Sequence, residues 1–99
     1  MKELKTEVEF QEIIQKGTVL IDFFATWCGP CKMLAPELEK LESAEVIKVD
    51  VDKFPNLTKE YNIMGVPTLL LFKNGQLVSR KSGYMTQEML EEWIHSVIA

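Results

Sequence analysis

Apolar and polar positions along the chain follow patterns that predict alternating strands and helices. The clearest pattern is Val19–Ala25, an apolar run that is interrupted by a single acid, Asp22. The run is rich in β-formers and too short for a helix of about 10–12 residues, so it predicts a buried strand. Other β-rich runs predict the remaining strands at 46–51, 68–72 and 77–82, with a short edge strand at most at 2–4.

Apolar residues at helical spacing predict four helices. Thr6 and Glu9 form a capping-box pattern at the start of the first helix, and Gly17 is expected to end it at the C′ position. The pair Gly29-Pro30 is expected to end the buried strand. The second helix is then predicted from Cys31 onward, with a kink at Pro36. The remaining helices are expected at 55–61 and after the N-cap candidate Thr86.

The order of these elements predicts an α/β fold. Strands that are separated by helices lie parallel, and Asn74-Gly75 favours a type I′ turn that joins two antiparallel strands. We therefore expect a central mixed sheet of three parallel strands plus an antiparallel C-terminal hairpin, flanked by four helices. The 99 residues fit a single domain, 1–99.

Composition and charge narrow the function. Eleven Lys and Arg residues against fifteen Asp and Glu residues make the chain mildly acidic, and no basic cluster offers a site for nucleic acid. No stretch approaches the roughly 20 apolar residues that span a bilayer, and the N-terminus lacks the apolar core of a signal peptide. We therefore expect a cytoplasmic protein, a monomer, with no membrane partner. Structural disulfides are rare in that compartment.

The two cysteines, Cys28 and Cys31, form a C-x-x-C motif with three common interpretations. A zinc site needs a second pair of ligands, but the chain has no other cysteine and its one histidine, His95, lies far along the sequence. A structural disulfide would close a very small loop and constrain the unfolded chain little. The remaining interpretation, a redox dithiol with no metal, is the one that C-x-x-C near a βαβ pattern favours.

The motif order suggests different roles for the two sulfurs. Cys28 is expected at the N-terminus of a helix, where unpaired N–H groups and the helix dipole stabilise a thiolate. Our hypothesis is that Cys28 is the attacking nucleophile and Cys31 the resolving thiol. Trp27 and Gly29, which flank Cys28, suggest an exposed surface that a substrate could meet.

Three other residues have two interpretations each. Asp22 is either a buried acid with a raised pKa, suited to exchange a proton with Cys31, or an acid that faces solvent at a strand edge. Lys48, on the next strand, either approaches and tunes Asp22 or is an ordinary surface lysine. Pro67 is either a cis proline or the first residue of a strand, and the residues alone favour the second interpretation.

A resemblance to a known family bears on these alternatives. The segments W-C-G-P-C-K, preceded by D-F-F-A, then K-V-D-V-D and G-V-P-T-L-L-L-F-K-N-G, resemble the thioredoxin family over nearly the whole chain. The inner Gly29-Pro30 pair separates this branch from glutaredoxins, disulfide isomerases and periplasmic oxidases. Two departures are visible, since Phe24 stands where many members carry tryptophan, and the first strand is short.

The resemblance implies a role for each matching position. Cys28 matches the nucleophile and Cys31 the resolving cysteine of a redox-active Cys28–Cys31 disulfide. Asp22 matches the buried proton acceptor and donor, Lys48 the lysine that tunes it, and Pro67 a cis proline that faces the dithiol. Residues that match the substrate-binding surface are Trp27, Gly29, Pro30, Gly65, Val66 and Gly83.

The activity implied is reduction of disulfides in client proteins by dithiol–disulfide exchange, as part of cell redox homeostasis. The resemblance implies that a thioredoxin reductase regenerates the dithiol with electrons from NADPH or ferredoxin, so that no cofactor need bind this chain. Two alternatives remain open at this point. One is a binding module whose surface matters more than its redox state, and the other is an oxidase or isomerase of an oxidising compartment, which the missing signal peptide disfavours.

Overall fold

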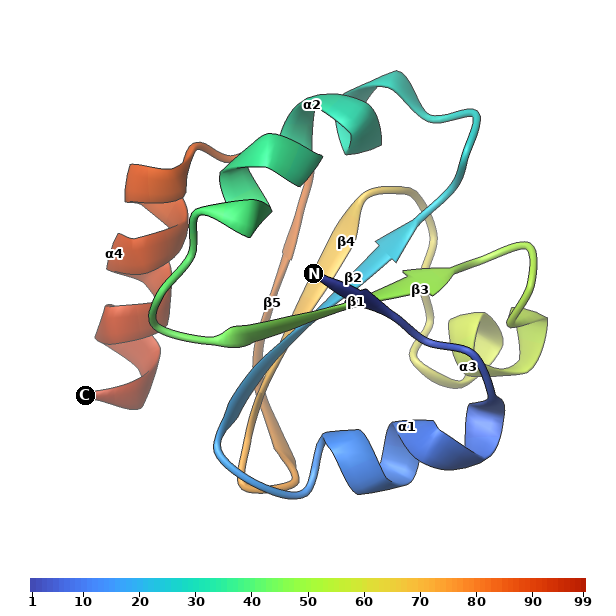
Figure 1. Cartoon of the computed structure of the whole chain (residues 1–99), viewed down its shortest axis with the longest axis horizontal. Helices are drawn as coiled ribbons and strands as arrows, with labels where there is room; N and C mark the ends of the chain where they lie inside the picture. Colours follow the sequence, from blue (N-terminus) through green and yellow to red (C-terminus); the bar gives the residue numbers. More distant parts are fainter.

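The computed structural model, which describes residues 1–99, is built on one five-stranded mixed sheet (Figure 1). The strands lie in the order β1-β3-β2-β4-β5, and β2 is central, parallel to β3 and antiparallel to β4. The arrangement confirms the predicted set of three parallel strands and an antiparallel hairpin. The strand bounds are β1 (Lys2–Glu3), β2 (Thr18–Phe24), β3 (Glu45–Asp50), β4 (Thr68–Lys73) and β5 (Gln76–Ser82).

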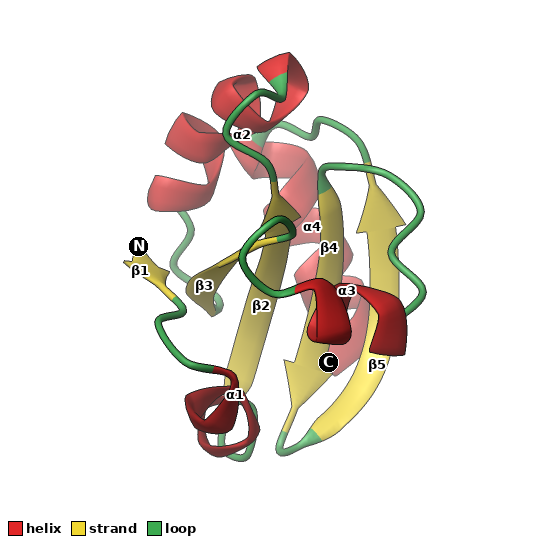
Figure 2. Cartoon of the chain, turned by 90° about the vertical axis from the view of Figure 1, so that its right-hand side faces the viewer, coloured by secondary structure: helices red, strands yellow, loops and turns green.

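Helices cover both faces of the sheet, as predicted. Figure 2 shows α3 in front of the sheet and α4 behind it. One core cluster joins β2 to α1 and α3, and a second joins the opposite face to α2 and α4. None of the helices is both long and apolar enough to span a bilayer. The helix bounds are α1 (Glu7–Ile13), α2 (Gly29–Glu39), α3 (Pro55–Glu60) and α4 (Gln87–Ile98).

The central strand β2 is buried on both faces. Successive side chains of a strand point to opposite faces, so Ile21 and Phe23 enter the core under α1 and α3, whereas Leu20 enters the core under α2 and α4. Two-sided burial explains why this strand has an almost continuous apolar run rather than an alternating one. By the same alternation, Asp22 lies on the face that α2 covers.

Two helix boundaries differ from the prediction. The capping box of Thr6 and Glu9 is present, but α1 ends at Ile13 rather than at Gly17. Gly17 has a φ of +73° in the turn before β2, where its N–H and C=O both bond to Asn74, each at 2.9 Å. This glycine therefore serves the contact with the hairpin and not a helix cap.

The second difference lies at the start of α2. The strand β2 ends at Phe24, and Gly29 and Pro30 are the first residues of α2, so they do not end the strand. Proline is favourable there because the first turn of a helix has no use for its missing N–H group. The hairpin turn follows the prediction, since Asn74 and Gly75 both have positive φ, +49° and +89°.

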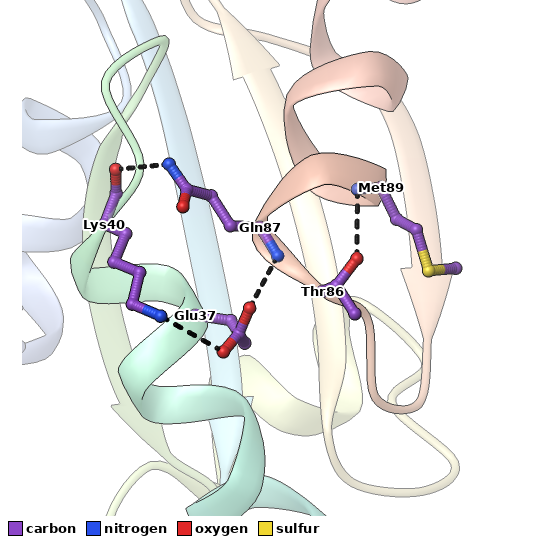
Figure 3. Close-up of polar contacts among 5 residues, drawn as sticks. All are labelled: Glu37, Lys40, Thr86, Gln87 and Met89. Carbon is purple, nitrogen blue, oxygen red and sulfur yellow. Dashed lines mark hydrogen bonds and ion pairs between the residues drawn. The ribbon is translucent and has the colours of Figure 1, made fainter.

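Polar contacts join the helix α2 to the start of α4 (Figure 3). The Glu37 carboxylate accepts a hydrogen bond from the Gln87 N–H (2.8 Å), and the Gln87 side chain donates to the Lys40 carbonyl (3.0 Å). Lys40 also forms an ion pair with Glu37 (3.6 Å), while Thr86 caps α4 by accepting from the Met89 N–H (3.3 Å). A carboxylate at a helix N-terminus satisfies an unpaired donor and complements the helix dipole. Glu37 therefore fixes α4 against the second half of α2.

We predict that Glu37→Ala lowers the free energy of unfolding by about 1 kcal/mol, because it leaves one N-terminal donor of α4 without its partner. Chemical denaturation measures this change. Glu39→Ala is the matched control, since Glu39 lies on the same helix, is exposed and has no such contact. Equal losses in the two variants would contradict the role assigned to Glu37.

Candidate redox site

The dithiol lies where the chain leaves β2 and begins α2. Cys28 is the N-cap residue of α2, and its sulfur accepts a hydrogen bond from the Cys31 N–H at 3.2 Å. The two cysteines form a disulfide with their Cα atoms 5.3 Å apart, and both are buried against Phe24 and Ala25. After reduction, the same N–H group and the positive end of the helix dipole would stabilise a thiolate at Cys28.

The loop before β4 lies against Cys28. The Cys28 sulfur is 3.7 Å from the Val66 carbonyl oxygen, and the Val66–Pro67 peptide bond is cis. The Pro67 carbonyl accepts a hydrogen bond from the Gly83 N–H at 3.0 Å, and Gly83 has a φ of +91°, which favours glycine. The Thr68 hydroxyl donates to the Gly65 carbonyl at 2.6 Å. These contacts hold the loop beside the dithiol.

An apolar groove of about 340 Å³ lies next to this loop. Trp27 is 69% exposed at its rim, where the indole N–H donates to the Asp52 carboxylate at 3.0 Å. Met64 is 95% exposed, the most exposed large apolar side chain of the molecule. The residues that line the groove are Trp27, Val51, Thr58, Ile63, Met64, Gly65 and Val66.

The structure thus groups most of the predicted surface residues. Trp27, Gly65 and Val66 share the groove, while Gly29 and Pro30 are exposed at the start of α2. Sequence reasoning missed Met64 and Asp52. The position of Met64 beside Gly65 was a usable signal, but nothing in the sequence pairs Asp52 with an indole 25 residues earlier.

Asp22 is a buried acid. Its side chain is 1% exposed, and its Oδ1 atom has no hydrogen-bond partner. Burial raises the pKa of Asp22 to about 7, and the positive charge of Lys48 acts in the opposite direction. Lys48 is paired with Asp22 in the register of β2 and β3, and its Nζ atom lies 4.2 Å from the centre of the Phe24 ring. Near neutral pH Asp22 therefore exists in both protonation states.

A second cavity, of about 440 Å³, has Cys31 in its lining and shares no lining residue with the groove. Its lining includes Lys48, the register partner of Asp22 on β3, and Phe24, which lies further along β2 on the same face as Asp22. The remaining lining residues are Glu3, Ala25, Thr26, Lys32 and Ala35. The two sulfurs therefore have different neighbours, since Cys28 contacts the groove loop and Cys31 lines the cavity. No group of three or more His, Cys, Asp or Glu side chains is placed to bind a metal ion.

The pKa of Asp22 predicts how its replacement changes stability with pH. The folded protein binds this proton more tightly than the unfolded chain, whose carboxyl has a pKa of 3.8. The stability contributed by the protonated form is complete below pH 3.8, is lost as the pH rises towards 7, and stays lost above 7. The full difference of about three pKa units corresponds to about 4 kcal/mol.

We therefore predict that Asp22→Asn unfolds with a higher free energy than the wild type at pH 8, by up to about 4 kcal/mol, and that the gain disappears towards pH 4. Denaturant titrations at several pH values measure this difference. Glu12→Gln, on the exposed side of α1, controls for the loss of one negative charge. A gain from Asp22→Asn that is the same at pH 4 and pH 8 would contradict the raised pKa.

Comparison with known proteins matches this chain along almost its full length. The thioredoxin family model covers residues 2–96. A thioredoxin of Staphylococcus aureus is 44% identical over 92 residues, which cover 88% of each chain. The oxidized mitochondrial thioredoxin 3 of Saccharomyces cerevisiae superposes with a TM-score of 0.86 at 38% identity, over 97% of this chain and 94% of that one.

A third similar chain comes from a structure on the thiol resolving mechanism of a yeast mitochondrial 1-Cys peroxiredoxin via glutathione/thioredoxin systems. It has a TM-score of 0.86 and 37% identity, and the match covers 97% of this chain and 94% of that one. These matches agree with the presence of a disulfide-bonded C-x-x-C pair at the start of α2, the helix that follows the central strand. This chain belongs to the thioredoxin family of thiol–disulfide oxidoreductases.

Proposed function

We propose that Cys28 is the nucleophile and Cys31 the resolving thiol in the reduction of client protein disulfides, with Asp22 as the proton acceptor and donor for Cys31. The observation that carries this assignment is the different surroundings of the two sulfurs. Cys28 caps α2 and lies 3.7 Å from the Val66 carbonyl at the groove, whereas Cys31 lines a separate cavity with Lys48. A client would therefore meet Cys28 first.

The first step forms a mixed disulfide. The Cys28 thiolate attacks one sulfur of the client disulfide, an S–S bond forms between them, and the second client sulfur leaves as a thiolate that takes a proton from solvent. The groove would hold the client chain through Trp27, Gly65 and Val66, with Gly29, Pro30, Pro67 and Gly83 around it. The backbone N–H and C=O groups of this loop could form hydrogen bonds with the backbone of an extended client chain. Such bonds do not depend on the client's side chains.

The second step releases the reduced client. Asp22, as carboxylate, takes the proton of the Cys31 thiol, and the resulting thiolate attacks the Cys28 sulfur. The bond between Cys28 and the client breaks, the client leaves as a thiolate, and the Cys28–Cys31 disulfide forms. Two electrons have passed from the dithiol of this chain to the client. Lys48 would tune Asp22, because its charge favours the carboxylate form.

The cycle needs an external source of electrons. We infer that a thioredoxin reductase, supplied by NADPH or ferredoxin, returns the disulfide to the dithiol, and that no cofactor binds this chain itself. We further infer that residues 1–99 act as one domain and as a monomer in the cytoplasm, in cellular electron transport and redox homeostasis. Two core clusters that share one sheet support the single domain. The similar chain from the structure on a 1-Cys peroxiredoxin supports the proposal that proteins with reactive thiols or disulfides are partners of this chain.

We predict that reduced Cys31→Ser accumulates a covalent complex with a disulfide-containing client such as insulin, because the second step lacks its attacking thiol. Cys28→Ser should form no such complex. Non-reducing gels after mixing, together with insulin reduction by the wild type in the presence of a reductase and NADPH, measure both outcomes. Trapping by Cys28→Ser but not by Cys31→Ser would reverse the assignment, and trapping by neither would favour a binding module.

A further inference from the structure

An acid, a base and a second acid lie in one row across three parallel strands. Glu3 on β1 is paired in register with Lys48 on β3, and Lys48 is paired with Asp22 on β2. Residues of one row point to the same face of a sheet, about 5 Å from their neighbours. The row therefore leads from the sheet edge, where β1 lies in Figure 2, to the buried acid at its centre.

Glu3 lies at the cavity that reaches Cys31. Glu3 and Lys48 both line that cavity of about 440 Å³ together with Cys31. The Glu3 carboxylate forms an ion pair with Lys53 at 3.6 Å, and its side chain is 42% exposed. Lys48 forms no ion pair, and its Nζ atom lies over the Phe24 ring instead. The half-buried Lys48 is thus the register neighbour of both acids, and its ammonium forms an ion pair with neither.

Few other charged groups face Asp22. On β4 its register partner is Leu69, and α2 contributes Cys31 and Lys32 to the lining of the cavity. Burial raises the pKa of Asp22 and Lys48 opposes that change. Neighbouring charges could therefore change the pKa of Asp22 by changing the position of the Lys48 ammonium.

We propose that Glu3 is a positioning residue for the resolving step, because it competes with Asp22 for the Lys48 ammonium. The ion pair with Lys53 neutralises part of the Glu3 charge and so weakens this competition. When Glu3 attracts Lys48 outward, Asp22 holds its proton more tightly. When Glu3 is paired with Lys53, Lys48 stays nearer to Asp22 and favours the carboxylate that accepts the Cys31 proton. The inference rests on the proposed role of Asp22 in the function above.

Replacing either member of the outer pair should move the pKa of Asp22 in opposite directions. Glu3→Gln is expected to lower it by about 0.5 unit, and Lys53→Gln to raise it by a similar amount, mainly because each change alters how closely the Lys48 ammonium approaches Asp22. The Lys53→Gln effect should shrink to about 0.1 unit in the Glu3→Gln background. NMR titration of the Asp22 carboxyl carbon in the full-length reduced protein measures all four forms.

Two controls separate positioning from general charge. Glu12→Gln removes the same charge from α1, on the other face of the sheet, and should leave the pKa of Asp22 unchanged. In a Lys48→Met background the Glu3→Gln shift of the Asp22 pKa should fall to less than half, because only the direct, screened effect of the Glu3 charge then remains. A shift from Glu12→Gln as large as that from Glu3→Gln would overturn the proposal, and so would a full Glu3→Gln shift without Lys48.

The kinetic measurement is the release of client from a preformed mixed disulfide with Cys28 as a function of pH. Its midpoint should follow the Asp22 pKa in each variant. If Asp22→Asn leaves this midpoint in place, the proposed proton role of Asp22 fails. If Asp22→Asn removes the midpoint but Glu3→Gln and Lys53→Gln do not move it in opposite directions, only the role of Glu3 fails.

Discussion

Burial of β2 on both faces is the constraint on which the site depends. Because helices cover each face, every side chain of the strand from Val19 to Phe24 is removed from water, including that of Asp22. A carboxyl in that position has no solvent to stabilise its charge and, at Oδ1, no hydrogen bond either. The same strand ends just before Cys28. One rigid element therefore fixes both the buried acid and the start of the dithiol turn.

The two ends of the dithiol differ because the chain on either side of it differs. Cys28 belongs to the N-cap of α2 and meets the loop that contains Val66, so its sulfur lies where a second chain can approach. Cys31 is one turn further into the helix and contacts the sheet. A symmetric pair of thiols in the sequence thus becomes an asymmetric pair in space, which is what an exchange reaction in two successive attacks needs.

The sequence was sufficient where local chemistry decides the structure. The apolar run 19–25 predicted the central strand, Asn74-Gly75 the hairpin turn, and Thr6 with Glu9 the cap of α1. It was insufficient where a residue's partner is set by packing. Gly17 was expected to end a helix but bonds to Asn74 in the turn that follows the neighbouring strand β4, and the bond from Gln87 to Glu37 depends on how two helices meet. The approach of Lys48 to Asp22 was among the expectations, but the place of Glu3 beside Lys48 could not be foreseen, because the register of a two-residue edge strand has no signature in the sequence.

A proton acceptor for a thiol works best when its pKa is close to the pH at which it operates, and here two opposing effects produce that value. Burial raises the pKa of Asp22 to about 7 although Lys48 acts against it, whereas a carboxylate in water stays ionised far below neutral pH. Lys48 limits the effect of burial without removing it, because its ammonium lies over the Phe24 ring and not in contact with the carboxylate. A direct salt bridge would return Asp22 to an ordinary acid, permanently charged near neutral pH. For the proposed role of Asp22 as proton acceptor, the absence of that bond therefore matters as much as the presence of the lysine.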